Sequence, residues 1–373
     1  MILLDGGRFD SLKKVPSFNT WINKGALFSQ MITYGPQTVT ALHSLFSGIN
    51  GNINGANNYY GCLNFKKKLC KTLPQYLQQV GYHTSANLLQ DIILPKQGFD
   101  SITLHDEHTD DIVSVHTNLI KEQDKIRKQN KNFFLFLQYS PIHTNMIQNV
   151  VKKHNYDDFS KEYFNNKEEN LKNYEASVMK ADDYLNKILK LSEDLSLFED
   201  TLFIIFSDHG ASVGEKPGEL GYGRFCYDYT IKSFVCFIHN NEFPKTEITK
   251  LCRLIDIFPT ILDLLKIPES PNFLKIQGKS LIPLMNNEPD ERFALSEAAG
   301  VEQKPTNTPP KLKSIRTRDW KLIYHTDTNE NELYDIIKDP KEEQNLISSN
   351  LPKAKELFIK LRSLCPELEK INF

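Results

Sequence analysis

The stretch Leu202-Phe203-Ile204-Ile205-Phe206-Ser207-Asp208-His209-Gly210 decides the fold class of this chain. Its first five residues are apolar without interruption, which is typical of a strand buried on both faces of a parallel sheet. An acid and an imidazole follow at the carboxyl end of that strand, where open parallel sheets place their binding sites. The stretch therefore predicts an α/β protein whose functional groups gather at one edge of the sheet.

Further strands and helices alternate along the chain. The other clear apolar runs are Ile2 to Leu4, Phe133 to Tyr139 and Phe234 to Ile238. Helical patterns cover Thr72 to Val80, Glu168 to Leu191 and Leu251 to Leu265. This alternation predicts an alkaline-phosphatase-like α/β sandwich, in which helices flank a mainly parallel central sheet. The polar stretches His105 to Asn132 and Asn145 to Asn170 are interpreted as surface insertions, the second a candidate lid.

The pattern changes near residue 293. A Pro/Thr/Asn-rich loop at Glu302 to Lys311 precedes two short strand patterns, Leu312 to Thr317 and Trp320 to Tyr324. A final helix is expected from Pro352 to Leu364. We therefore predict a catalytic domain over residues 1–292 and a small C-terminal α+β subdomain over residues 293–373.

Composition excludes several functional classes. The 373 residues include 45 Lys and Arg against 47 Asp and Glu, so no global charge favours nucleic acid or anionic membrane. No run approaches the ~18 apolar residues of a membrane span. The first residues lack the pattern of a signal peptide. The six cysteines show no CxxC pair. A cytoplasmic protein without an integral membrane segment or nucleic-acid partner is expected.

Two acids and an imidazole stand at predicted strand ends. Asp5 follows the first strand, and Asp208-His209 follows the strand quoted above. This donor set suits a divalent cation such as Zn or Mn, and less well Ca. Each residue also has a simpler interpretation, because an Asp after a strand often caps a helix or forms a turn. His143, after the strand ending near Tyr139, could equally be a hydrogen-bonded loop histidine.

Several motifs, in a shared order, carry a resemblance to a known family. They are Asp5-Gly6-Gly7-Arg8, Gly35 to Gly48, Gly81-Tyr82-His83-Thr84, Gly98-Phe99-Asp100, Ser207-Asp208-His209-Gly210, Tyr227 to Lys232, Asp256 to Thr260, Gly278 to Leu281, Trp320-Lys321-Leu322, Glu332 to Asp335 and Asp339-Pro340. In this order the chain resembles the sulfatase family of the alkaline phosphatase superfamily along almost its whole length. The family's nucleophile stands ten residues before the Gly of a Ser/Thr-Gly pair, and that position is Thr38.

The resemblance implies roles for individual residues. One divalent metal ion (Zn, Mn or Ca) would be bound by Asp5, Asp208, His209 and the Thr38 hydroxyl. A metal would lower the pKa of that hydroxyl and make it a nucleophile. His143 would contact the ester oxygens or the leaving group. Arg224 would hold two oxygens of a phosphate or sulfate, although a surface arginine in a Gly-rich loop is equally consistent.

The chain also departs from the family pattern. The Cys/Ser-x-Pro-x-Arg sequence that yields formylglycine reads Thr38-Val39-Thr40-Ala41-Leu42 here, so no formylglycine is expected. The second acid of the usual Asp-Asp pair is Gly6, and Gly218 to Arg224 contains no histidine. The family's Gly-Lys-x-His segment is missing as well. A second metal site is therefore expected to be incomplete or absent.

These observations predict a metal-dependent hydrolase or transferase. It would act on phosphate monoesters or diesters through a covalent Thr38 intermediate, since a sulfated threonine requires a further hydrolytic attack. The alternatives are a sulfuric ester hydrolase and a degenerate, non-catalytic sulfatase-like protein. The substrate would be a small-molecule ester or an ester of a glycan or lipid head group. Oligomeric state is left open.

Overall fold

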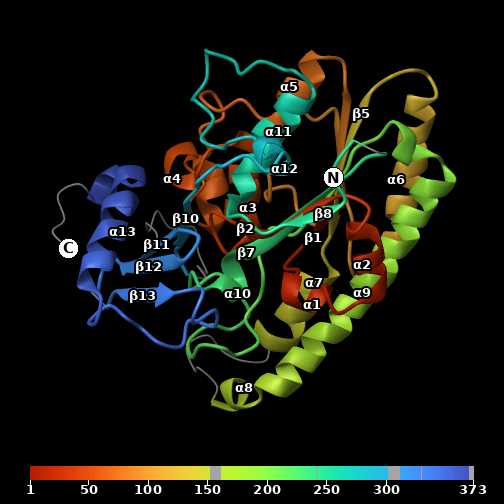
Figure 1. Cartoon of the computed structure of the whole chain (residues 1–373). Coiled ribbons are helices and arrows are strands. Elements are labelled where there is room, and N and C mark those ends of the chain that lie inside the picture. Colours follow the sequence, from red (N-terminus) through yellow and green to blue (C-terminus); the bar gives the residue numbers. More distant parts are fainter. Residues whose placement is uncertain (152–160, 241, 301–310, 329, 369–373) are drawn as a thin grey trace.

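The chain folds around two sheets of different size. The computed structural model describes residues 1–151, 161–240, 242–300, 311–328 and 330–368. Within these ranges a nine-stranded central sheet lies between helical layers, and a four-stranded sheet lies beside it (Figure 1). The arrangement confirms the predicted fold class.

The central sheet is mainly parallel. In spatial order its strands are β4 (Ser101–Leu104), β3 (His83–Leu88), β5 (Phe133–Tyr139), β1 (Ile2–Leu4), β6 (Phe203–Phe206), β7 (Lys232–Ile238), β2 (Ala26–Ile32) and β8 (Thr246–Ile248), with β9 (Cys252–Arg253) paired to β2. Only β7 among these described strands runs antiparallel to its neighbours. Ile2 pairs with Leu137 on one side and Ile205 on the other, so β1 lies inside the sheet. This position explains why β1, β5 and β6 are apolar on both faces.

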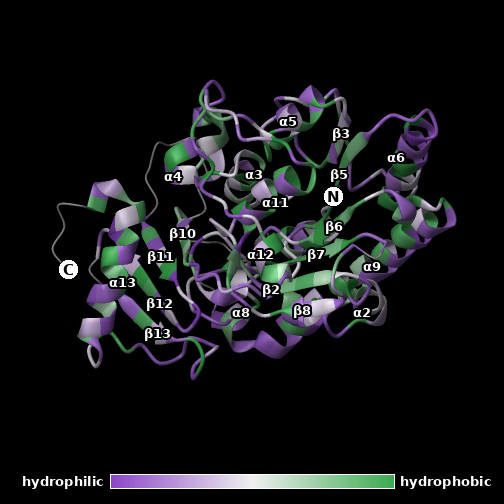
Figure 2. Ribbon diagram, turned by 45° about the horizontal axis from the view of Figure 1, so that its top comes forward, coloured by the Kyte–Doolittle hydropathy of each residue, from purple (hydrophilic) through white to green (hydrophobic). Residues whose placement is uncertain are grey.

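Helices bury apolar residues against both faces of the sheet. One face carries α3 (Thr38–Ser47), α5 (Leu73–Gln79) and α11 (Ile257–Leu264). The other carries α1 (Phe9–Leu12), α2 (Pro16–Ile22), α6 (Ile112–Arg127) and α9 (Lys167–Asp194). Shorter helices are α4 (Gly51–Asn54), α7 (Pro141–Met146), α8 (Lys161–Asn165), α10 (Asp228–Ile231) and α12 (Ile282–Met285). Figure 2 shows hydrophobic residues along the central strands and hydrophilic ones on outward helix faces.

Two local signals position the nucleophile helix and its neighbour. α3 ends at Gly48, whose φ of 67° is a left-handed conformation that favours glycine. α5 begins with a capping box, in which Thr72 and Gln75 satisfy each other's backbone amides. Gly48 thus explains where α3 ends, and the capping box explains why α5 starts close to its predicted bound.

The smaller sheet belongs to the C-terminal part of the chain. It is antiparallel in the order β10 (Ala294–Ala298), β11 (Leu312–Arg316), β12 (Trp320–His325) and β13 (Glu332–Asp335), and α13 (Leu351–Leu364) packs on it. A shared apolar cluster, which includes Ile231 and Tyr334, joins it to the central sheet. The domain boundary between residues 292 and 293 stays a prediction.

The structure differs from the sequence-based expectations in two places. The polar stretch 105–132 is not merely a surface insertion, because it contains α6, whose buried His116 and Ile120 face the core. The helical pattern from Leu251 begins as β9 and a 3₁₀ turn, so α11 starts only at Ile257. In both cases tertiary burial overrides the local pattern.

Other expectations concern the candidate lid and the membrane. In the stretch 145–170, residues 152–160 lie outside the described residues, as do residues 302–310 of the predicted loop. Within the described ranges, no helix combines the length and the apolar character needed to cross a bilayer. The six cysteines are free thiols.

Candidate active site

Four segments that are distant in sequence meet at the carboxyl ends of three central strands. Asp5 directly follows β1, and the pair Asp208-His209 comes just after β6. His143 lies in α7, immediately beyond β5, and Thr38 is the first residue of α3. Because these strands run parallel, their carboxyl ends open at the same edge of the sheet. The fold therefore brings together five of the six residues proposed for the site.

The Thr38 hydroxyl lies between an acid and an imidazole. Its Oγ1 donates a hydrogen bond to Oδ1 of Asp5 at 3.2 Å and lies 3.2 Å from Nε2 of His209. All three side chains are buried. The start of a helix presents backbone N–H groups and the positive end of the helix dipole. A negatively charged group attached to Thr38 would be stabilised there.

Asp208 lies in the same buried cluster and keeps one oxygen unpaired. Its Oδ1 accepts a hydrogen bond from the amide of Gly6 at 3.1 Å. Its Oδ2 is buried without a hydrogen-bond partner among the described residues, 3.4 Å from Nε2 of His209. Gly6 adopts a φ of 70°, a conformation that favours glycine. The glycine that replaces the family's second acid thus holds Asp208 through its backbone.

His143 connects the buried cluster to the loop that follows β6. Its Nδ1 lies 3.3 Å from Oδ1 of Asp5, and its Nε2 lies 3.0 Å from the hydroxyl of Tyr222. The Tyr222 ring also packs against His209, with ring centres 4.9 Å apart. Burial favours the neutral form of His143, but the neighbouring Asp5 carboxylate outweighs it and raises the pKa of His143.

The two carboxyl groups of the cluster titrate in opposite directions. Burial opposes ionisation of Asp5, but the His143 and His209 imidazoles outweigh it and lower the pKa of Asp5. Burial raises the pKa of Asp208, and the adjacent Asp5 charge raises it further. Two acids in one buried site repel each other when both are ionised. A cation between them would relieve that repulsion.

The donor atoms fit a divalent metal ion. Asp5, His143 and His209 each offer one ligand atom, and these atoms lie within 4.8 Å of one another. The unpaired Oδ2 of Asp208 supplies a further buried oxygen nearby. Mixed carboxylate and imidazole ligands are typical of Zn and Mn. This geometry makes His143 a candidate ligand, in addition to the substrate contact expected from sequence.

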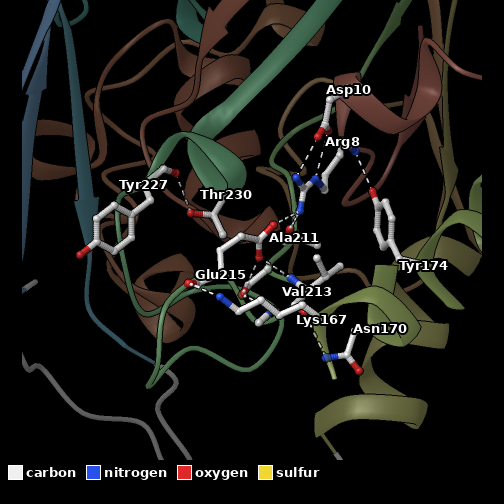
Figure 3. Close-up of polar contacts among 12 residues, drawn as sticks. Arg8, Asp10, Lys167, Asn170, Tyr174, Ala211, Val213, Glu215, Tyr227 and Thr230 are labelled. Carbon is white, nitrogen blue, oxygen red and sulfur yellow. Dashed lines mark hydrogen bonds and ion pairs between the residues drawn. The ribbon is translucent and has the colours of Figure 1, made fainter. Parts of the chain in front are cut away.

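Arg8 supports the loop behind Asp5 instead of joining the cluster. Figure 3 shows its guanidinium between Asp10 and Glu215, at 2.8 Å and 2.5 Å. The backbone amide of Arg8 donates to the hydroxyl of Tyr174 at 2.7 Å, and that hydroxyl donates to the carbonyl of Gly6 at 2.7 Å. These contacts hold the turn that carries Asp5.

Comparison with known families decides the family of this chain. The sequence model of the sulfatase family matches residues 9–267, and a second one, for the C-terminal part of N-sulphoglucosamine sulphohydrolase, matches residues 218–370. The chain belongs to the sulfatase family. It is therefore a member of the alkaline phosphatase superfamily, as the motifs predicted, and its relatives are ester hydrolases.

One curated relative of this sulfatase-family chain is an N-acetylglucosamine-6-O-sulfatase of Bacteroides thetaiotaomicron. The two are 27% identical over 197 residues, which cover 50% of this chain and 34% of the relative. The match thus spans about a third of that relative's length. The family match and the ligand atoms described above together support a divalent metal in this chain, and the identity of the metal is left open.

Solved structures share the sulfatase fold across the whole chain. One, a complex with its substrate D-glucosamine-2-N,6-O-disulfate, covers 99% of this chain and 98% of its own, with a TM-score of 0.76 at 18% identity. Another, a phosphonate monoester hydrolase from Silicibacter pomeroyi, covers 98% of this chain and 94% of its own, with a TM-score of 0.69 at 14% identity. At these identities the likeness shows the fold alone.

Arg224, the sixth proposed site residue, lies in the loop after β6. Its backbone amide donates to Oε1 of Glu219 at 3.0 Å, and the amide of Phe225 donates to the same oxygen at 2.9 Å. The described contacts do not join its guanidinium to Thr38. Its role in holding substrate oxygens stays a prediction.

Two further residues of the candidate site were not predicted from sequence. Tyr222 contacts His143, as described above. Gln138, the penultimate residue of β5, donates from Nε2 to Oδ2 of Asp5 at 2.6 Å. The only signal for Gln138 was a polar residue inside an apolar strand, and Tyr222 had no signal beyond its place in a Gly-rich loop.

Proposed function

We propose that this sulfatase-family chain is a metal-dependent hydrolase of sulfate esters, with Thr38 as its nucleophile. The observation that carries the proposal is the position of Thr38 Oγ1, 3.2 Å from both Asp5 Oδ1 and His209 Nε2. A buried hydroxyl between an acid and an imidazole, at the start of a helix, suits attack on an anionic ester. The sulfate preference is supported by the family and by the curated relative.

The metal would be held by residues of this one cluster. Asp5, Asp208 and His209 would bind it, together with the Thr38 hydroxyl, while His143 would stay outside the ligand set as the proton donor. When bound, a divalent ion supplies positive charge that lowers the pKa of a coordinated hydroxyl and polarises an ester oxygen. We propose one such ion, because Gly6 stands where a second acid would support another.

The reaction would proceed in two displacements at sulfur. Oγ1 of Thr38 forms a bond to sulfur while the bond to the ester oxygen breaks, and Asp5, whose Oδ1 accepts the hydrogen bond of that hydroxyl, accepts its proton. His143, whose pKa is raised by Asp5, is placed to give a proton to the leaving alcohol. Water then attacks the sulfated threonine, which releases sulfate and restores the hydroxyl.

Thr38 itself favours a second candidate, the hydrolysis or transfer of phosphate esters. A threonine cannot be converted to formylglycine, so the aldehyde route for releasing sulfate is closed to this chain. A phosphorylated threonine is resolved by attack of water or an acceptor alcohol at phosphorus. The same cluster would stabilise that transition state. The likeness to a phosphonate monoester hydrolase is one of fold only.

The proposed substrate class rests on the curated relative and not on the shape of the site. The curated relative is named for a sulfated amino sugar. We therefore propose a sulfated glycan or small sugar as substrate, with lipid head-group esters less favoured. A cytoplasmic location is likewise kept as a proposal.

A side-by-side rate measurement tests the function. Purified protein with Mn²⁺ or Zn²⁺ would be assayed on 4-nitrophenyl sulfate, 4-nitrophenyl phosphate and bis(4-nitrophenyl) phosphate. Faster turnover of the sulfate supports the main proposal, and faster turnover of either phosphate supports the second candidate. In both cases Thr38→Ala abolishes turnover and Thr38→Ser retains part of it. Stoichiometric metal without turnover of any of the three esters would overturn both and favour a non-catalytic member of the family.

A further inference from the structure

A second cleft lies outside the proposed reaction centre. It encloses about 840 Å³ and is lined by the starts of α1, α9 and β7, by the loop after β6 and by the C-terminal segment 336–343. None of Asp5, Thr38, Asp208 and His209 is among its described lining residues. Figure 3 shows Arg8, Val213 and Glu215, which form part of its wall.

Lys232, at the start of β7, is a cation of this cleft without an ion-pair partner. It is half-buried, and no carboxylate of the described residues forms an ion pair with its ammonium group. Burial lowers the pKa of Lys232, and the carboxylates of Asp228, Asp10 and Glu247, each paired with another cation, only partly offset this effect. A charge removed from water without a partner is unfavourable. An anion bound beside Lys232 would remove that cost.

A buried ion cluster next to Lys232 carries excess positive charge. Asp228 pairs with Lys321 at 2.5 Å and with Arg316 at 3.6 Å, and Glu342 pairs with Lys321 at 2.6 Å. Together with Lys232, three cations therefore face two carboxyl groups. Nε of Arg316, another lining residue, is buried and has no hydrogen-bond partner among the described residues.

The remaining acids of the cleft do not balance this charge. Asp10 and Glu215 both pair with Arg8. Glu168 and Glu343 are exposed, so water screens their charge. Apolar side chains, Leu251 and Ile336 among them, also line the cleft and give it room for more than an inorganic ion.

We propose that this cleft is a second ligand site, which binds a sulfate or phosphate group, with Lys232 and Arg316 as the groups that receive it. Lysine and arginine are the usual partners of such oxyanions, and charge-assisted hydrogen bonds are the stronger kind. The anion is either a free inorganic ion or a group on an organic molecule whose apolar part contacts Leu251 and Ile336. The site acts independently of Thr38, so it stands whichever ester the reaction centre cleaves.

Calorimetric titration of the full chain tests the proposal. The probes are inorganic sulfate and 2-naphthalenesulfonate, which carries an apolar ring system and has no ester to hydrolyse. Lys232→Gln is compared with Lys187→Gln, a matched loss of one charge on an exposed α9 lysine paired with Asp183. We expect Lys232→Gln to raise the Kd for at least one probe about tenfold and Lys187→Gln to leave it unchanged.

The two probes separate the two sources of the anion. If Lys232→Gln weakens the binding of both sulfate and 2-naphthalenesulfonate, the site accepts free anions. If it weakens the binding of 2-naphthalenesulfonate alone, the site is one for an organic anion. Equal affinities of the wild type and Lys232→Gln for both probes would overturn the proposal. A crystal soaked in selenate provides an independent test. Selenium density beside Lys232 would support the site. Selenium density at Thr38 alone contradicts it.

Discussion

The hydroxyl of Tyr222 lies 3.0 Å from Nε2 of His143, although 79 residues separate the two in sequence. Because Nδ1 of the same imidazole lies 3.3 Å from Asp5, His143 links the loop after β6 to the buried acid. Tyr222 thereby positions an imidazole that the proposed reaction uses as a proton donor.

Tyr222→Phe should lower kcat and leave KM nearly unchanged. The variant keeps the ring against His209 but loses the hydroxyl beside His143, at a cost of about 1 kcal/mol or a fivefold rate loss. Steady-state kinetics across pH 5 to 9 measure this, and the change should include a shifted pH profile for the group that donates the proton. Tyr222→Leu, which also removes the ring, should lose more. Wild-type rates and an unchanged profile in Tyr222→Phe would show that the contact has no role in the reaction.

Gln138→Met should destabilise the protein and weaken metal binding together. It removes a buried donor to Oδ2 of Asp5 and an acceptor for the half-buried amide of Leu89, just after β3. Leaving such groups unpaired costs about 2 kcal/mol. Urea unfolding and metal titration measure the two effects. A variant as stable as the wild type would contradict the assigned hydrogen bonds.

Metal removal should lower the Tm of the protein, whereas Asp208→Asn should raise the Tm of the metal-free form. Chelation with EDTA should lower Tm, since a ligand present at a hundred times its Kd stabilises by about 2.7 kcal/mol. Without metal, Asp208→Asn should raise Tm at neutral pH, because it removes one of two repelling buried acids and keeps the oxygen that accepts from Gly6. With metal added, the same variant should gain little stability. Thermal unfolding of the wild type and of Asp208→Asn, each with and without Mn²⁺, measures these effects. If Mn²⁺ raised the Tm of Asp208→Asn as much as that of the wild type, Asp208 would be excluded as a ligand.

Glu219 should make stability fall as pH rises from about 5 to about 7. Burial raises its pKa to about 7 from 4.5, although the amides of Arg224 and Phe225 favour the charged form. Between these values the folded protein holds a proton that the unfolded chain has lost, so the free energy of unfolding decreases with pH. The full effect is about 3 kcal/mol.

Glu219→Gln isolates this contribution. Glutamine keeps an oxygen that accepts from the two backbone amides, and it does not titrate. The variant should therefore be more stable than the wild type at pH 8 and similar to it at pH 5. Urea unfolding at both pH values measures the difference. An equal difference at the two pH values would assign the effect to packing instead of ionisation.

Much of the fold could be predicted because continuous apolar runs have few possible environments. β1 and β5 have the predicted bounds, since a strand that is apolar along nearly its whole length must be covered on both faces. α6 could not be predicted, because its mean composition is polar and only tertiary contacts reveal the buried side of His116 and Ile120. The start of α11 was misplaced for a related reason, as an apolar stripe does not distinguish β9 from a helix.

By itself the sequence determined the family, the strand ends that carry Asp5 and Asp208-His209, and Thr38 as the residue at the nucleophile position. These features are local, because each depends on residue types at short spacing. Only the tertiary structure decided that Gln138 and Tyr222 contact the site, that His143 lies beside Asp5, and that Lys232 faces a cleft without a paired acid. Such contacts join side chains whose separation in sequence carries no pattern, and the packing of helices and loops on both sheets brings them together.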